Sequence, residues 1–375
     1  MTRVTVWDSL VEEGSLTPDV PADLVRTPDV LIVGGGAVGL CVAVACLRAG
    51  LGHVVVLERE PRLAAAASGG NAGAIAPDMH VTTDPAAFVA FGRWSRDLYR
   101  AWDGEWDGIL GLTPVRWLTV FGPGFAVPDV LPARDVLSPS AVAALEPDVR
   151  VPEGGGAVLV DGQLRVNPQR LVAGLARHAG QVATGVAMLD VTVRGDRIAT
   201  VHTSAGDFAP GALVVATGLV PAPWADGVPQ RWVKGHMAAV APGPWRLGSV
   251  LAGPLGGGTP LADGTVVCGG TFDEGDLSPE VVPSVADGLV ADLARVLPAA
   301  STAVTTHRWC CFRPYIEGRQ PVVDRLPGVV NGWFAGGHFT TGIMMAAATG
   351  AAVAQWVSSS VAPAAVAGFD LPVVR

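Results

Sequence analysis

Three glycines, Gly34, Gly36 and Gly39, follow one apolar run and precede a longer one. Their GxGxxG spacing is typical of a turn that binds a dinucleotide. The first glycine permits the tight turn, the second lets a pyrophosphate approach the backbone, and the third allows the next helix to pack closely. The amides that begin this helix add partial positive charge. The three glycines therefore predict a pyrophosphate site.

Glu58 ends the next apolar run, about 20 residues after Gly39, where an acid accepts hydrogen bonds from ribose hydroxyls. A carboxylate at this place also repels a 2′-phosphate, so NADP is disfavoured. The turn and the acid do not by themselves choose between NAD and FAD. A structural glycine turn followed by a surface glutamate is the alternative, and the combination of strand, helix and acid weighs against it.

These residues need two strands and a helix to position them. Apolar runs at 30–33 and 54–57 predict the strands, and the apolar segment between them, which ends at Gly50, predicts the helix. Such a βαβ opening predicts a parallel sheet.

The same pattern of apolar strands and helices returns later in the chain. A helix is predicted at 85–102 from its amphipathic rhythm, and another at 167–180 with Pro168 near its start. A strand at 212–216 and a final helix at 342–356 complete this part.

Two regions, 112–149 and 229–306, have short alternating apolar runs separated by glycine and proline, which predicts antiparallel sheet. Within the second region, 261–271 is typical of a hairpin with Asp263 and Gly264 at its turn.

The predicted fold class is α/β plus antiparallel β: a Rossmann-like nucleotide-binding domain with a discontinuous antiparallel-sheet substrate domain. The predicted bounds are an N-terminal extension at 1–28, a nucleotide-binding domain at 29–111, 150–228 and 307–375, and a substrate domain at 112–149 and 229–306. We expect the extension, with hydrophobic residues at Trp7 and Leu10, to lie over the domain surface, and we assign it no chemistry.

Composition excludes several classes of function. The net charge is −9, and Lys234 is the only lysine among 25 basic residues, so no basic stripe could neutralise a phosphate backbone of nucleic acid. The five cysteines are odd in number and lack zinc spacing, which predicts no metal site and favours a reducing cytoplasm. No secretory signal is expected, and the apolar stretches are interrupted before the roughly 18 residues that a spanning helix needs. We therefore expect no stable membrane insertion.

Several motifs occur in a familiar order. They are VGGGAVG with LERE, ASGGNAG at 67–73, VNPQRL at 166–171, VVATG at 214–218, WCCFRP at 309–314 with QPVVDRLPG, and GGHFTTGIMMAAATG at 336–350. From about Asp29 to the last helix, the chain resembles the FAD-dependent D-amino-acid oxidase, glycine oxidase and sarcosine oxidase (DAO) family. The last stretch most resembles glycine oxidase.

The resemblance implies FAD as the cofactor. The cofactor-binding residues that it implies are Gly34, Gly36, Ala37, Val38, Gly39, Glu58, Arg59, Ser68, Gly70, Asn71, Ala72, Gly73, Val186, Ala216, Thr217, Gly218, Cys311, Gly337, His338, Thr340, Thr341, Gly342 and Ile343. A helix that begins at 341–343 would direct its N-terminal amides at the pyrimidine edge of the flavin, which is negative when reduced. For the 67–73 loop, a polar loop without cofactor contact is the alternative.

Arg313 is implied as the substrate-binding residue, because a guanidinium holds a carboxylate bidentately and stays protonated. The alternative is an arginine paired with Glu317 or Asp324. Tyr315 and His236 are further pocket candidates, and so is His338, for which packing is the favoured alternative.

The chain departs from the family at several positions. Where glycine oxidases have an arginine it has Thr340, and where they have a pocket tyrosine our alignment places Gly257. We therefore predict that glycine is a poor substrate and that a bulkier amine binds. Cys311 aligns with the cysteine that tethers flavin in the sarcosine and pipecolate oxidase branch, with a buried structural thiol as the alternative.

We predict FAD-dependent oxidation of an amino acid or related small amine, by hydride transfer to the flavin and formation of an imine. The alternatives are a secondary-amine oxidase or demethylase with flavin attached at Cys311, a dehydrogenase with an acceptor other than oxygen, a nicotinamide-dependent dehydrogenase, and a non-catalytic flavoprotein. The branch's oxygen-activating lysine would fall near Gly269, whereas Lys234 lies elsewhere, so the sequence leaves the electron acceptor open. It also leaves the oligomeric state open.

Overall fold

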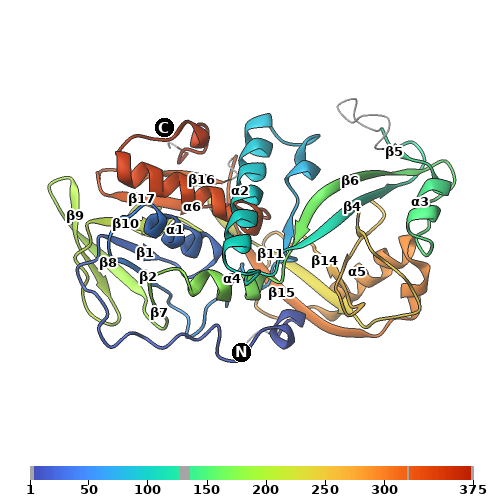
Figure 1. Ribbon diagram of the computed structural model, residues 1–375, viewed down its shortest axis with the longest axis horizontal. Helices are drawn as coiled ribbons and strands as arrows, with labels where there is room; N and C mark the ends of the chain where they lie inside the picture. The colour runs from blue at the N-terminus through green and yellow to red at the C-terminus, as the bar shows by residue number, and fades with distance from the viewer. Residues whose placement is uncertain (1–3, 127–135, 319–320, 373–375) are drawn as a thin grey trace.

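The computed structural model describes residues 4–126, 136–318 and 321–372. A six-stranded sheet, on the left of Figure 1, has the order β16, β17, β10, β1, β2, β7. These strands are β16 Val322–Arg325, β17 Gly332–Gly336, β10 Ala212–Val215, β1 Val30–Val33, β2 Val54–Leu57 and β7 Gln181–Ala183. All neighbours are parallel except β16, which runs antiparallel to β17.

The central strands of this sheet are covered on both faces. Every residue of β1, β2 and β10 is buried, which is why these strands are continuous apolar runs without polar alternation. The parallel βαβ opening predicted from the sequence is therefore confirmed.

Two helices, α1 Ala37–Arg48 and α6 Gly342–Ser359, pack against each other over this sheet (Figure 1). Their approach is close because Gly350 of α6 has no side chain, and an added Cβ would meet the backbone of Cys41 in α1. The helix predicted at 342–356 is confirmed.

Two more helices complete this layer. In α2 Ala86–Glu105, the buried Tyr99 hydroxyl donates to the carbonyl of Ile343 at 3.0 Å, which ties the first turn of α6 to α2. In α4 Pro168–Ala176, the Asn167 side chain accepts the amides of the first turn. Both predicted helices are present, although α4 ends at Ala176 and not near residue 180.

Two of the other sheets lie on the right of Figure 1. One has the order β13, β14, β11, β15 and is antiparallel; another has β12, β4, β6, β3, with β5 paired to β6. Only the β12 and β4 pair is parallel in the second sheet. The strands are β3 Ala74–Ile75, β4 Thr113–Phe121, β5 Val136–Leu137, β6 Gly156–Arg165, β11 Gln230–Val240, β12 Val250–Ala252, β13 Thr259–Pro260, β14 Val266–Gly269 and β15 Thr305–Ile316.

The predicted hairpin at 261–271 lies within this part, because the Gly264 amide donates to the Leu261 carbonyl between β13 and β14. The strands β6 and β15 extend these sheets beyond the predicted bounds at 149 and 306. The division into two domains stays a prediction.

The remaining elements are short or peripheral. They are the hairpin of β8 Met188–Arg194 and β9 Arg197–Thr203, the helices α3 Pro139–Leu145 and α5 Pro283–Val296, and the 3-10 turns η1 Val6–Leu10, η2 Pro77–His80, η4 Pro298–Thr302 and η5 Ala364–Val366. Within the described residues, the helices lack the combined length and apolar character for crossing a bilayer.

The N-terminal segment is held to the rest of the molecule by a buried tryptophan. Trp7 in η1 is 1% exposed and packs with Met237, Leu261, Val267 and Trp309. Leu10, the other hydrophobic residue named in this segment, is 46% exposed. The segment is therefore anchored through Trp7.

Candidate flavin and substrate site

A cavity of about 680 Å³ lies where the six-stranded sheet meets β11 and β15. Its size is that of a ligand site. The predicted residues that line it are Gly34, Gly36, Val38, Glu58, Arg59, Ser68, Asn71, Ala72, Val186, Ala216, Thr217, Gly218, Cys311, Arg313, His338, Thr340, Gly342 and Ile343. Segments that are distant in sequence therefore meet at one site.

The glycine turn at one end of the cavity has the close backbone approaches that its sequence predicts. Gly34 has a φ of +118°, and an added Cβ would meet the carbonyl of Ala216. An added Cβ on Gly39 would meet the carbonyl of Gly34, so the helix packs directly on the turn. The Ser68 hydroxyl accepts the Ala37 amide at 3.0 Å, which attaches the 67–73 loop to the start of α1.

Glu58 lies beside this turn. Its carboxylate accepts the Gly35 amide at 2.8 Å and the Glu60 amide at 2.9 Å. Burial raises the pKa of Glu58, while these two amides and the neighbouring Arg59 oppose the rise. The Arg59 side chain is mostly exposed and pairs with Glu60 at 3.3 Å. The structure thus holds a carboxylate at the cavity wall, where a ribose would bind.

The opposite end of the cavity is formed by the start of α6. Gly342 and Ile343 line it, and the preceding Thr341 hydroxyl donates to the His338 carbonyl at 2.9 Å. A helix N-terminus at this end suits the negatively charged edge of a reduced flavin. A cavity that extends from a glycine turn and an acid to a second helix N-terminus fits an extended FAD.

The 67–73 loop forms a third wall. The Asn71 side chain accepts the Gly73 amide at 2.7 Å, and Gly73 has a φ of +78°. The Gly70 carbonyl accepts the indole N–H of Trp309 at 3.0 Å, and the Cys311 thiol donates to it at 3.6 Å. Cys311 is 3% exposed and lines the cavity.

Arg313 extends into the cavity from β15 and is partly buried. Its Nη1 donates to the Thr271 carbonyl at 2.8 Å, and its guanidinium lies 4.8 Å from the ring centre of Phe272. Burial lowers the pKa of Arg313, but an arginine stays protonated at any physiological pH. The site therefore holds a cation beside an aromatic ring.

The acids that could have neutralised Arg313 have other partners. Glu317 lies 3.9 Å from Arg231, and Asp324 accepts the amides of Arg325 and Leu371. Within the described part of the chain, the ion pairs do not include Arg313. Asp273 is near enough to act on its charge, but the Asp273 carboxylate is hydrogen-bonded to His236 and Thr271. The guanidinium can therefore still bind a ligand.

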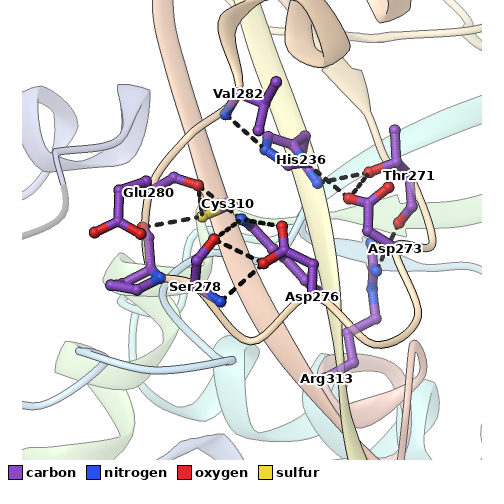
Figure 2. Close-up of polar contacts among 11 residues, drawn as sticks. His236, Thr271, Asp273, Asp276, Ser278, Glu280, Val282, Cys310 and Arg313 are labelled. Atoms are coloured by element: carbon purple, nitrogen blue, oxygen red, sulfur yellow. Dashed lines mark hydrogen bonds and ion pairs between the residues drawn. The ribbon is translucent and has the colours of Figure 1, made fainter.

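A loop at 271–282, between β14 and α5, supplies the Thr271 carbonyl and is fixed by the lysine of β11 (Figure 2). Lys234 is 0% exposed, and its ammonium donates to Asp276 at 2.7 Å, Ser278 at 3.1 Å and the Glu280 carbonyl at 2.7 Å. All three donors of the ammonium are satisfied. The hydrogen bond from Lys234 lowers the pKa of Asp276.

His236 fixes the same loop at two other points (Figure 2). Its Nε2 accepts the Val282 amide at 2.9 Å, which requires the neutral Nδ1–H tautomer, and Nδ1 donates to Asp273 at 2.7 Å. Asp273 also accepts the Thr271 hydroxyl at 2.6 Å. His236 is not a lining residue of the cavity, so its predicted place in the pocket is wrong, and its contacts are with the loop.

The other pocket candidates lie at the edge of the cavity. His338 lines it, but its Nε2 is hydrogen-bonded to Thr349 of α6 at 2.9 Å, and burial lowers the pKa of His338 to about 3. This supports packing over catalysis. Tyr315 does not line the cavity; its ring packs against Phe339, which does.

Six other predicted cofactor residues shape the walls without lining them: Ala37, Gly39, Gly70, Gly73, Gly337 and Thr341. Gly337 has a φ of +62°, and an added Cβ would meet Ile316. Gly257 does not line the cavity, and an added Cβ there would meet the Leu251 carbonyl. The expected loss of a pocket tyrosine at this position stays a prediction.

Sequence reasoning did not identify several lining residues. Trp232, Met237, Phe272 and Phe339 all line the cavity. Phe272 is 59% exposed, and Phe339 has a φ of +49°. The only sequence signal was that large aromatic residues follow Gly270 and His338, each in a segment rich in glycine.

The chain matches the family described as DAO, FAD dependent oxidoreductase, over residues 29–356. The bifunctional protein ThiO/ThiG of Synechocystis sp. is 29% identical over 348 residues, which cover 88% of this chain and 52% of that protein. Glycine oxidase of Pseudomonas aeruginosa is 26% identical over 342 residues, which cover 85% and 92%. The chain thus spans about half the length of the first ThiO/ThiG relatives and most of the glycine oxidase.

Solved structures share the fold. Glycine oxidase from Geobacillus kaustophilus superposes with a TM-score of 0.79 at 22% identity, covering 92% of this chain and 99% of that one. L-proline dehydrogenase from P. horikoshii also has a TM-score of 0.79, at 16% identity, covering 92% and 97%. The predicted fold class and the predicted FAD cofactor are confirmed. The glycine turn, the acid after β2 and the match along most of the chain make this protein a member of the DAO family of FAD-dependent oxidoreductases.

Proposed function

We propose that this protein oxidises the C–N bond of an amino acid or of a related small amine that carries a carboxylate. When bound, FAD supplies the acceptor for the hydride that leaves the carbon next to nitrogen. The observation that carries the substrate class is Arg313, a partly buried cation that lines the cavity and has no carboxylate partner among the described ion pairs. A substrate carboxylate would provide that partner.

Arg313 would bind and orient this substrate. Its Nη1 donates to the Thr271 carbonyl, so the guanidinium is fixed before a ligand arrives. A fixed guanidinium holds a carboxylate with defined geometry and thereby places the adjacent carbon for reaction. Hydride leaves the carbon next to a neutral amine and an iminium remains, so the ammonium form of the substrate first releases one proton to solvent.

The wall beside Arg313 supports a substrate with an apolar side chain. Phe272 lies against the guanidinium, and its ring centre is 5.7 Å from that of Phe339. Thr340 also lines the cavity, where it adds no charge. We propose that these residues contact the substrate's side chain and that glycine is consequently a poor substrate.

A secondary-amine oxidase with flavin attached at Cys311 is a second candidate, favoured by the place of this thiol in the cavity wall. Colour that remains with acid-precipitated protein would support it, and complete release of the flavin would exclude it.

The proposal includes either oxygen or another molecule as the electron acceptor. Lys234 does not distinguish between them, because its contacts are with the 271–282 loop. The compartment we propose is the cytoplasm, because an odd set of five cysteines is unusual in exported proteins.

The test is anaerobic bleaching of the bound flavin by a panel of D-, L- and N-methyl amino acids, each beside its decarboxylated amine. We expect apolar amino acids to reduce the flavin and their decarboxylated analogues to bind at least about tenfold more weakly, the value of a charged hydrogen bond. A screen in which glycine exceeds every larger amino acid would contradict the proposed side-chain wall. Failure of every amine would contradict the proposed function itself.

Arg313→Gln supplies the matching variant. We expect its kcat/KM for amino acids to fall about 100-fold and its preference for a carboxylate to disappear. Arg308→Gln is the control, because Arg308 is on the same strand but pairs with Asp287 at 2.7 Å. Equal losses in the two variants would show that Arg313 acts only on stability.

A further inference from the structure

The N-terminal segment contacts the cofactor cavity from outside the part of the chain that matches the family. The match begins at residue 29, whereas Trp7 is 1% exposed and donates its indole N–H to the Asn71 carbonyl at 3.0 Å. Asn71 and Ala72 line the cavity. A feature that the family match does not include therefore touches the wall of the FAD site.

This contact determines how one peptide of the wall is oriented. A trans peptide is planar, so the Ala72 amide points away from the side on which the Asn71 carbonyl meets Trp7. The preceding carbonyl, that of Gly70, is held in the same way by the indole of Trp309. Two buried indoles thus fix two successive peptides of the wall.

The segment itself is held firmly enough to act in this way. Thr5 and Asp8 form a capping box around the start of η1, and Asp8 pairs with Arg62 at 3.0 Å. Gln169 of α4 donates to the Thr5 hydroxyl at 3.1 Å and accepts from Arg62 at 3.0 Å. Burial opposes ionisation of Asp8, but hydrogen bonds from Thr5, Arg62 and Gln169 outweigh it and lower its pKa.

The position of the indole also joins the two parts of the molecule. It packs against Met237 and Val267 of the antiparallel sheet, and Ala72 of the loop packs on the same cluster. Figure 1 shows the N-terminal turn below the junction of these parts. A side chain in this place can transmit a change in the N-terminal segment directly to the 67–73 loop.

We propose that Trp7 is a positioning residue of the FAD site: by holding the Asn71 carbonyl, it presents the Ala72 amide and the Asn71 side chain to bound FAD. The alternative is that Trp7 only fills the core. The two differ in one respect, because a filler contributes to folding whereas a positioning residue contributes to cofactor affinity beyond its effect on folding.

The variant Trp7→Phe separates them, since it keeps an aromatic ring and removes the N–H donor. Trp333→Phe is the matched control: Trp333 is 3% exposed in the core of the six-stranded sheet, and its indole nitrogen has no hydrogen-bond partner among the described residues. Both variants lose the same volume, and only the first loses a hydrogen bond. The apoproteins are titrated with FAD, and flavin fluorescence gives the dissociation constant. Urea unfolding of the same apoproteins gives their stability.

We expect the FAD dissociation constant of Trp7→Phe to rise about tenfold, as for a buried carbonyl left without its donor. That of Trp333→Phe should stay within about twofold of the unmodified protein, the range expected of a mutation without contact to the ligand. An unchanged FAD affinity in Trp7→Phe, with stability lowered as in Trp333→Phe, would overturn the proposal.

A second variant decides the matter if Trp7→Phe does not fold. Asp8→Asn leaves the tryptophan in place and removes the charge that pairs with Arg62, so the segment is loosened at its edge. We expect about threefold weaker FAD binding and an altered spectrum of the bound flavin at saturation, because the loop wall becomes mobile. FAD affinity and spectrum identical to those of the unmodified protein would overturn the proposal.

Discussion

Arg313 and His338 show how burial gives similar residues different roles. Both line one cavity, and burial lowers the pKa of each. Arg313 keeps its proton because guanidinium is a much weaker acid than imidazolium. His338 is neutral and hydrogen-bonded to Thr349. One residue can therefore bind an anion, and the other packs.

The pKa of His338 gives a testable dependence of stability on pH. It is lowered from 6.5 to about 3 in the folded protein, so between these values the unfolded chain binds the extra proton. The contribution of His338 to the free energy of unfolding is therefore fully present above pH 6.5 and is lost as the pH falls towards 3. Between pH 7 and pH 5 the loss from this group should be about 2 kcal/mol.

His338→Gln is the comparison, because its amide reaches towards Thr349 and does not titrate. We expect urea unfolding to show that the variant loses about 2 kcal/mol less than the unmodified protein between pH 7 and pH 5. Parallel pH profiles of the two proteins would contradict a neutral, buried His338.

At the scale of elements, the 271–282 loop is a wall of the site fixed by β11. Lys234→Met removes the buried ammonium and leaves Asp276 and the Glu280 carbonyl without their donor. We expect hydrogen exchange in the loop to become about tenfold faster, since local opening depends on such bonds. The KM for substrate should also rise several-fold, because the loop carries the carbonyl that fixes Arg313.

The matched control is Arg231→Met. Arg231 is on the same strand and contacts Glu274 of the same loop at 3.3 Å, but its side chain is 41% exposed. An exposed ion pair contributes little, so exchange and KM should change by less than about twofold. Equal effects from the two variants would show that the loop does not depend on the buried lysine.

At the scale of the whole molecule, the cofactor should stabilise the fold because its site is assembled from distant segments. FAD at about 100 times its dissociation constant should add about 2.7 kcal/mol to the free energy of unfolding. Thermal unfolding with and without FAD measures this, and NAD at the same concentration is the control. Stabilisation by NAD and none by FAD would contradict the cofactor assignment.

The sequence predicted those parts of the fold and site that depend on local chemistry. The glycine turn, Glu58 and the helix at 342–356 lie within short motifs whose spacing carries their geometry. The contacts of Lys234 with residues more than 40 positions away carry no local pattern, and neither does the burial of Trp7. Phe272 was missed for the same reason, because its place in the cavity wall depends on the fold of the 271–282 loop.

The close packing of Gly350 against Cys41 has a consequence for biosynthesis. The strand β1 and helix α1 leave the ribosome well before their neighbours β10, β17 and α6, which come much later in the chain. The apolar surface around the glycine turn therefore stays exposed until α6 has been translated. We expect nascent chains to require protection by chaperones and to acquire FAD only after α6 has been translated.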